Sequence, residues 1–174
     1  NVAPSLLGGM TLVSSDSPLS ILPLPVLDLM LVVVTPAIQL ETQLSRQQLQ
    51  SDVALSLMVK QSADLAAVIA ALYLNDIDLF CQHLKDRVIG PQRHGNVLGY
   101  HQVEQAALDA GALAVALSGA GPTMFAIATS QQAAKGIEQA MLTAFNEVGL
   151  SANSWVSFMS PDGAAVVEEV SCNI

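Results

Sequence analysis

The sequence predicts an α+β fold in which helices cover one face of an antiparallel sheet. From about residue 50 onwards the pattern runs helices, a pair of strands, a helix and a second pair of strands. Strands that follow one another through short turns pair antiparallel, which is why the sheet is expected to be antiparallel. The chain has 174 residues, 52% of them hydrophobic, which is enough for one domain with an ample core.

The first part of the chain is predicted to be mostly extended. Residues 6–14 have the composition of a strand that the chain enters through Gly8 and Gly9. Residues 15–25 contain Ser, Asp and three prolines, which predicts a loop with at most a short extended piece. Residues 29–35 are a continuous apolar, β-branched run that stops at Pro36, and this predicts a buried strand.

Helices are predicted between residues 41 and 110. The first covers about residues 41–50, and its Thr42 and Arg46 share a face because they are four residues apart. Residues 53–74 show helical spacing of apolar side chains. The predicted stripe consists of Leu55, Val59, Leu65, Val68 and Leu72. A shorter helix over 77–88 is capped by Asn75-Asp76 and ended by Gly90-Pro91.

The rest of the chain alternates helices with strand pairs. Residues 93–97 are a predicted loop, and residues 100–110 a helix that Gly111 stops. Strands over 112–117 and 123–128 flank a glycine turn, and a helix over 131–148 ends at Gly149. A final hairpin is predicted to join residues 154–159 to 164–168 through the turn Ser160-Pro161-Asp162-Gly163.

Composition excludes several classes of partner. The net charge is −9, and the six Lys and Arg residues are scattered, so no basic patch for nucleic acid or an anionic membrane is expected. No apolar run approaches the roughly 18 residues of a membrane span. The three His and two Cys have no metal-ligand spacing, so we expect no metal site. Charged residues make up only 12% of the chain, so part of the apolar surface is expected to face another segment or subunit.

The most informative segment is the glycine turn at residues 117–127, which reads LSGAGPTMFAI. Gly119 and Gly121 reach backbone conformations that other residues avoid, and a small-residue turn of this kind presents backbone N–H groups to an anion. The alternative is a plain hairpin turn between two strands. Because Pro122 restricts the residue before it, we favour a negative φ at Gly121.

Four blocks in this order resemble the GHMP family of small-molecule kinases, and most closely its homoserine kinases. The first block is Asn1-Val2-Ala3-Pro4 at the start of the chain, and the second is Thr35-Pro36-Ala37-Ile38 followed by Thr42 and Arg46. The third is Pro91-Gln92-Arg93 with Leu98-Gly99-Tyr100, and the fourth is the glycine turn. Four ordered blocks are a more specific signal than any one of them.

The resemblance implies a ferredoxin-like GHMP C-terminal domain over residues 36–174 and a remnant of the N-terminal domain over residues 1–35. The family's phosphate-binding loop lies upstream of the Asn-Val-Ala-Pro block, and nothing in this sequence matches it. We therefore expect the chain to be the C-terminal part of a longer kinase, shortened by design or by proteolysis. By itself it is expected to be inactive.

The activity that the resemblance implies is ATP-dependent phosphorylation of the hydroxyl of L-homoserine, a step in threonine biosynthesis. ATP and Mg²⁺ would be bound mainly by the N-terminal half. A cytoplasmic location is expected, and a homodimer is left open. The alternative is a non-catalytic ferredoxin-like or ACT-like module that binds an amino acid or dimerises. That alternative fits the apolar composition equally well but leaves the four ordered blocks unexplained.

The resemblance also assigns roles to individual residues. Arg46 and Arg93 would bind the substrate carboxylate, since a guanidinium offers a carboxylate two parallel hydrogen bonds. Thr42 and Asn1 would be polar ligands of the substrate. Ser118, Gly119 and Gly121 would support the phosphate-binding loop. The alternatives without a role in binding are that both arginines are solvated surface residues and that the Thr42 hydroxyl bonds to the backbone of its own helix.

No catalytic residue is assigned. Of the three histidines only His94, beside Arg93, is a candidate for catalysis. His83 is expected on a mostly polar helix face and His101 at the start of a helix. The sequence offers no obvious general base, which phosphoryl transfer needs less than it needs positioning and charge neutralisation.

Overall fold

A computed structural model of the chain describes residues 2–39 and 49–167. The chain divides into two units. The first combines Asn1–Val26 with Ser160–Ile174, and the second is Leu27–Met159. The boundary predicted after residue 35 therefore falls inside the second unit. The predicted helix at 41–50 lies almost entirely outside the described residues.

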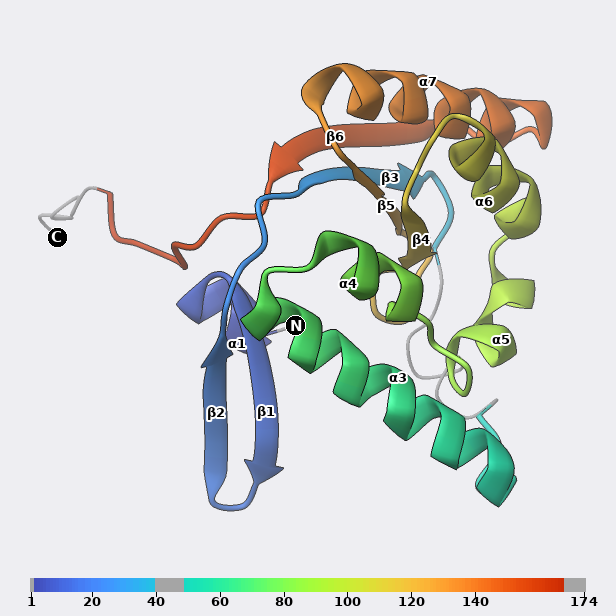
Figure 1. The fold of residues 1–174 in the computed structure, drawn as a ribbon. Helices are drawn as coiled ribbons and strands as arrows, with labels where there is room; N and C mark the ends of the chain where they lie inside the picture. Colours follow the sequence, from blue (N-terminus) through green and yellow to red (C-terminus); the bar gives the residue numbers. More distant parts are fainter. Residues whose placement is uncertain (1, 40–48, 168–174) are drawn as a thin grey trace, which may run out of the picture. The chain divides into compact units, whose positions relative to one another are not determined.

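The first unit is built on a short helix and a hairpin (Figure 1). Helix α1 (Val2–Leu7) precedes strands β1 (Met10–Asp16) and β2 (Leu19–Leu24), which pair antiparallel. The observed strand β1 thus begins four residues after the predicted start at residue 6. The prediction of a loop over 15–25 is wrong, because most of that range is strand β2. Its Pro23 is tolerated because a two-stranded sheet leaves one side of each strand without ladder bonds.

The end of the described chain returns to this unit without forming a strand. The Gly9 N–H donates to Ser160 O at 2.8 Å, and the Ala164 N–H donates to Ser5 O at 3.2 Å. Gly8 has a φ of +77°, and a Cβ there would lie 2.4 Å from the Pro161 carbonyl oxygen, so this close approach requires glycine. The hairpin predicted between 154–159 and 164–168 is wrong for residues 164–167, which form no strand, and the Ala164 N–H bonds to Ser5 instead of to β6.

The second unit contains a four-stranded antiparallel sheet. Its strands are β3 (Met30–Pro36), β4 (Ala114–Leu117), β5 (Met124–Ala128) and β6 (Ala152–Phe158), in the order β4-β5-β3-β6. Helices separate β3 from β4 and β5 from β6, so the order of elements is βαββαβ. The predicted α+β, ferredoxin-like sheet is confirmed. Strand β6 pairs with β3, which supplies the partner that the predicted hairpin lacks.

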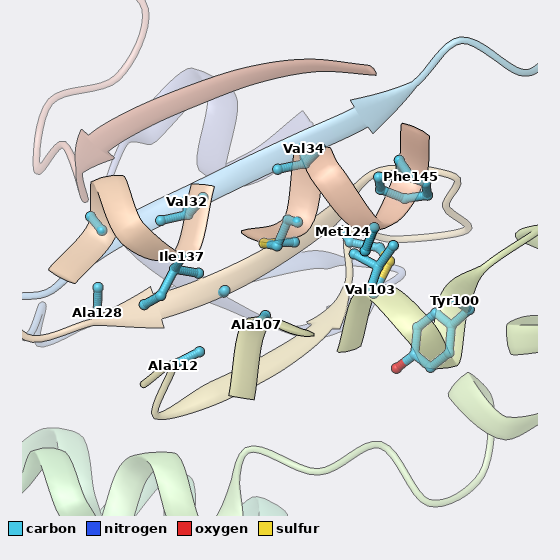
Figure 2. Packing of buried hydrophobic residues seen from close by; sticks show 14 of the residues in the cluster. Val32, Val34, Tyr100, Val103, Ala107, Ala112, Met124, Ala128, Ile137 and Phe145 are labelled. Carbon is cyan, nitrogen blue, oxygen red and sulfur yellow. The ribbon is translucent and has the colours of Figure 1, made fainter. Parts of the chain in front are cut away.

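Helices α6 (Tyr100–Asp109) and α7 (Gln131–Glu147) pack on one face of this sheet. Gly111, at φ +96°, directly follows the C-cap of α6, and Gly149, at φ +82°, directly follows that of α7, so both predicted ends are confirmed. The Ser130 hydroxyl accepts the Ala133 N–H at the start of α7. Figure 2 shows side chains of Val32, Met124, Val103 and Ile137 meeting between helices and sheet. Alanines fill much of this core, which lets the backbones approach closely.

Two further helices, α3 (Leu55–Leu74) and α4 (Ile77–His83), pack on each other. The Asp76 carboxylate caps α4 by accepting the Leu79 N–H at 2.9 Å. Residues of α3 and of the segment after α4 line a cavity with Phe125, whose side chain faces away from the α6/α7 core because neighbours along a strand alternate. Several buried side chains lie outside the α6/α7 core. They include Leu27, Leu29, Ala71, Leu72, Phe80 and Ile127.

The structure corrects several details of these helices. Of the predicted apolar stripe on α3, Leu72 is buried whereas Leu55, Val59 and Leu65 are exposed. Helix α4 ends at His83 instead of Val88. Gly90-Pro91 begins a short helix, α5 (Gly90–Arg93), instead of ending one, since proline suits the first turn of a helix. A 3₁₀ turn, η1 (His94–Asn96), replaces most of the predicted loop.

Helix α3 is long and apolar enough, by length and composition, to cross a membrane, which the sequence reading did not expect. A single helix of this kind is weak evidence for a span, because a helix that packs inside a folded domain passes the same test. Only 17% of the apolar window of α3 is buried, but the helix contacts α4, and its Asp64 is only 5% exposed and pairs with His83 and Arg87.

Candidate functional site

The glycine turn joins β4 to β5 at the end of the sheet. The Ser118 N–H donates to Thr123 O at 2.8 Å, and the Gly121 N–H donates back to Ser118 O at 3.1 Å. Gly119 and Gly121 have φ values of +62° and +79°. The negative φ favoured for Gly121 is therefore wrong, and both positions use a conformation that suits glycine. The predicted strand pair on either side is confirmed.

Arg93 reaches this turn from the last residue of α5. Its Nη1 donates to Gly119 O at 3.1 Å. Its Nε is buried and has no hydrogen-bond partner among the described residues. The sequence analysis assigns Arg93 and the glycines separate roles, whereas in the structure Arg93 contacts Gly119 directly. Because a guanidinium carries five N–H donors, Arg93 can hold the turn and still offer donors to a ligand.

A threonine that sequence reasoning used only as part of a block also meets the turn. Thr35, near the end of β3, lies with its Oγ1 2.9 Å from the Oγ1 of Thr123. The pairing of Val34 with Met124 brings these two hydroxyls together. The signal was present in the Thr-Pro-Ala-Ile block, but finding it requires knowing that β3 pairs with β5.

Three of the predicted substrate residues, Asn1, Thr42 and Arg46, lie outside the described residues. The described chain resumes close to Arg93. Gln50 donates its backbone N–H to Oε1 of Gln92 at 2.8 Å. Ser118 is exposed at the start of the turn, and its assignment stays a prediction.

His94 lies beside a cavity of about 170 Å³ that the turn borders. The lining includes Asp86, Gly90, His94, Tyr100, Glu104 and Gly119. The imidazole stacks on the Tyr100 ring with centroids 3.8 Å apart, and the Tyr100 hydroxyl donates to Glu104 at 3.0 Å. Burial lowers the pKa of His94 and, with Glu104 nearby, raises that of Tyr100, so both groups are neutral near pH 7.

The other candidates for reactive chemistry have structural explanations. His83, expected on a polar helix face, bonds to Asp64, with the Nδ1 2.9 Å from a carboxylate oxygen. Burial raises the pKa of the Cys81 thiol to about 11, which suits a core residue and not a nucleophile. Within residues 2–39 and 49–167 no three His, Cys, Asp or Glu side chains gather as metal ligands would.

The chain is similar in sequence to known kinases. Residues 97–147 match the family model described as GHMP kinases C terminal. The chain is 36% identical to a homoserine kinase of Chlorobaculum tepidum over 98% of its length and 54% of the relative's. It is 35% identical to one from Xanthomonas campestris, covering 96% of this chain and 51% of the relative. The chain thus spans about half the length of the curated relatives it matches.

Solved structures of kinases also resemble this chain. A crystal structure of homoserine kinase from Cytophaga hutchinsonii matches with a TM-score of 0.90 and 38% identity, over 94% of this chain and 52% of that one. The mevalonate kinase of L. major, at 17% identity and a TM-score of 0.63 over 84% of this chain and 47% of that one, shares the fold.

Proposed function

We propose that the chain belongs to the GHMP kinase family and is the C-terminal portion of an ATP-dependent homoserine kinase. The enzyme would transfer the γ-phosphoryl group of ATP to the hydroxyl of L-homoserine, in the cytoplasm, on the route to threonine. The observation that carries the proposal is the match to homoserine kinases over 98% of the chain.

In this proposal ATP and Mg²⁺ are bound mainly by residues that precede the chain. Phosphoryl transfer depends on positioning and on neutralising charge more than on a strong base. The described residues fit that division, since they offer no cluster of metal ligands and since His94 and Tyr100 are neutral. Gly119 and Gly121 would shape the turn that supports the phosphate-binding loop.

Arg93 and Arg46 would bind the α-carboxylate of homoserine, with Thr42 and Asn1 as polar ligands. Supporting this, Arg93 lies at the turn and keeps N–H groups beyond its bond to Gly119 O. Gln50, four residues after Arg46, bonds to Gln92, the neighbour of Arg93. Binding through two guanidinium groups would fix the orientation of the carboxylate and thereby place the hydroxyl for transfer.

The first test is activity. The longer protein that contains this chain, purified with ATP and Mg²⁺, is expected to release ADP in the presence of L-homoserine. Mevalonate, galactose and L-serine serve as comparison alcohols. Preference for any of these over homoserine, or an absence of turnover, would contradict the proposed substrate.

The second test concerns the carboxylate. Arg93→Ala is expected to raise the KM for homoserine roughly 2- to 13-fold, the equivalent of about 0.5–1.5 kcal/mol for one partly exposed hydrogen-bonding group. Arg46→Ala is expected to do so more strongly, roughly 10- to 150-fold, as for a charged hydrogen bond of about 1.5–3 kcal/mol. The KM for ATP should stay nearly constant in both variants.

Steady-state kinetics with each substrate varied in turn make this measurement. An unchanged KM for homoserine in Arg93→Ala would return Arg93 to a purely structural role at the turn. An equal loss for ATP would place it at the nucleotide instead.

A further inference from the structure

The helix that carries Arg93 is too short to be stable by itself. Helix α5 has four residues. An isolated helix of that length is unstable in water, because forming the first turn loses more conformational entropy than its hydrogen bonds compensate. Arg93 is its last residue. The direction of the guanidinium therefore depends on whatever fixes α5 from outside.

The Asp86 carboxylate supplies the main attachment at the start of this helix. Its Oδ1 accepts the N–H groups of Val88 at 3.0 Å and Ile89 at 2.8 Å, and its Oδ2 accepts that of Gly90 at 2.7 Å. Hydrogen bonds from backbone N–H groups to a carboxylate are charge-assisted and stronger than neutral ones. One side chain thus holds three successive backbone groups at the point where α5 begins.

The segment that carries Asp86 is itself fixed to α3. Gln61 accepts the Arg87 N–H at 2.7 Å and donates to Lys85 O at 3.3 Å. The Arg87 side chain bonds to the buried Asp64 on the same helix. The backbone on both sides of Asp86 is therefore held, so its carboxylate is a fixed point from which α5 extends.

At its other end α5 reaches the glycine turn. Gln92 donates to Val88 O at 2.6 Å, which joins the helix to the segment before it, and Arg93 donates to Gly119 O at 3.1 Å. The contacts run without a gap from α3 through Asp86 and α5 to Arg93. Losing the Asp86 carboxylate would free three N–H groups and release the start of the helix that aims the guanidinium.

We propose that Asp86 is a positioning residue that fixes Arg93 for binding the substrate carboxylate. The proposal rests on the proposed homoserine kinase function. Asp86 does not bind the substrate's carboxylate itself, since two carboxylates repel each other and its oxygens already accept backbone N–H groups. It acts through α5, and its effect exists only while Arg93 is present.

A double-mutant cycle in the longer protein tests this dependence. Asp86→Ala is expected to raise the KM for homoserine by a factor similar to that of Arg93→Ala, roughly 2- to 13-fold, with the KM for ATP nearly constant. In an Arg93→Ala background, Asp86→Ala is expected to raise it no further. Asp86→Asn keeps one acceptor oxygen and is expected to fall between wild type and Asp86→Ala.

Asp76→Ala is the matched control. Asp76 also accepts a backbone N–H at a helix start, that of Leu79 at 2.9 Å, but on α4. It is expected to lower the melting temperature and leave the KM for homoserine unchanged. A purely structural role for Asp86 would make the two variants behave alike.

Three results would overturn the inference: an unchanged KM for homoserine in Asp86→Ala, effects of Asp86→Ala and Arg93→Ala that multiply, or an equal KM change in Asp76→Ala. If Asp86→Ala does not fold, the same cycle is run with Asp86→Asn, for which the same outcomes apply. Failure of the proposed function is separate, because it appears as a wild-type protein that does not phosphorylate homoserine.

Discussion

Gly121 illustrates how much one backbone angle decides at the scale of a residue. Its φ of +79° lies in the left-handed region, where a Cβ meets steric strain of about 1–2 kcal/mol. The sequence pointed the other way, because the proline that follows restricts the backbone before it. The turn geometry, with Ser118 and Thr123 bonded across it, outweighs that local preference.

A substitution series at Gly121 follows from this angle. Gly121→Val is expected to lower the unfolding free energy by about 1–2 kcal/mol or more, and Gly121→Asn by less, because asparagine tolerates the left-handed region. Thermal melting of the purified variants measures whether Gly121→Val is less stable than Gly121→Asn. The support role proposed for the turn adds a second expectation, that Gly121→Val also weakens ATP binding.

Gly136 provides the comparison. It lies in α7 without a positive φ and with no heavy atom within 4 Å of a Cβ built there. Gly136→Ala is expected to raise stability by about 0.5–1 kcal/mol. A Gly121→Val protein that melts like wild type would show that the turn relaxes to accept a side chain.

At the scale of elements, Asp64 joins α3 to α4 and to the segment that precedes α5. Hydrogen bonds from Arg87 and then His83 hold the pKa of its carboxyl below the ordinary 3.8. A carboxyl with a lowered folded pKa stabilises the fold fully above its unfolded pKa. That contribution is lost as the pH falls through the folded value.

Asp64→Asn is therefore expected to lower the unfolding free energy at pH 7 by about 1–3 kcal/mol, since it leaves buried groups poorly paired. The difference from wild type should shrink below about pH 3.8, where the carboxyl of the unfolded chain binds protons while that of the folded protein is still ionised. Urea unfolding at several pH values measures it. Asp109→Asn, at an exposed site on α6, is the control. A pH-independent difference would mean that packing, and not charge, carries the effect.

Helix α3 shows a limit of pattern reading at this scale. Its composition is apolar around most of its circumference, so the 3.6-residue period predicts a helix but does not say which face is buried. The structure buries Asp64 and Leu72 and leaves Leu55, Val59 and Leu65 exposed. The buried carboxylate has partners in His83 and Arg87, which a pattern of apolar spacing does not reveal.

At the scale of the whole molecule, the chain covers about half of its homoserine kinase relatives. The proposed activity is therefore one that we assign to a longer protein of which this chain would be a part. Residues 1–174 alone are expected to show no ADP release with homoserine in the assay described above. Turnover by this chain alone would contradict the assignment of the ATP site to preceding residues.

The sequence by itself determined the order and ends of most elements in the second unit, and the family resemblance. Glycine after a helix, a capping side chain before one, and apolar runs of strand length are local signals, so Gly111, Asp76 and residues 29–35 were interpreted correctly. Tertiary structure alone decided that β6 pairs with β3, that Thr35 meets Thr123, and that Arg93 holds the glycine turn. These contacts join residues far apart in the chain, so they depend on how sheets and helices pack, which no local pattern encodes.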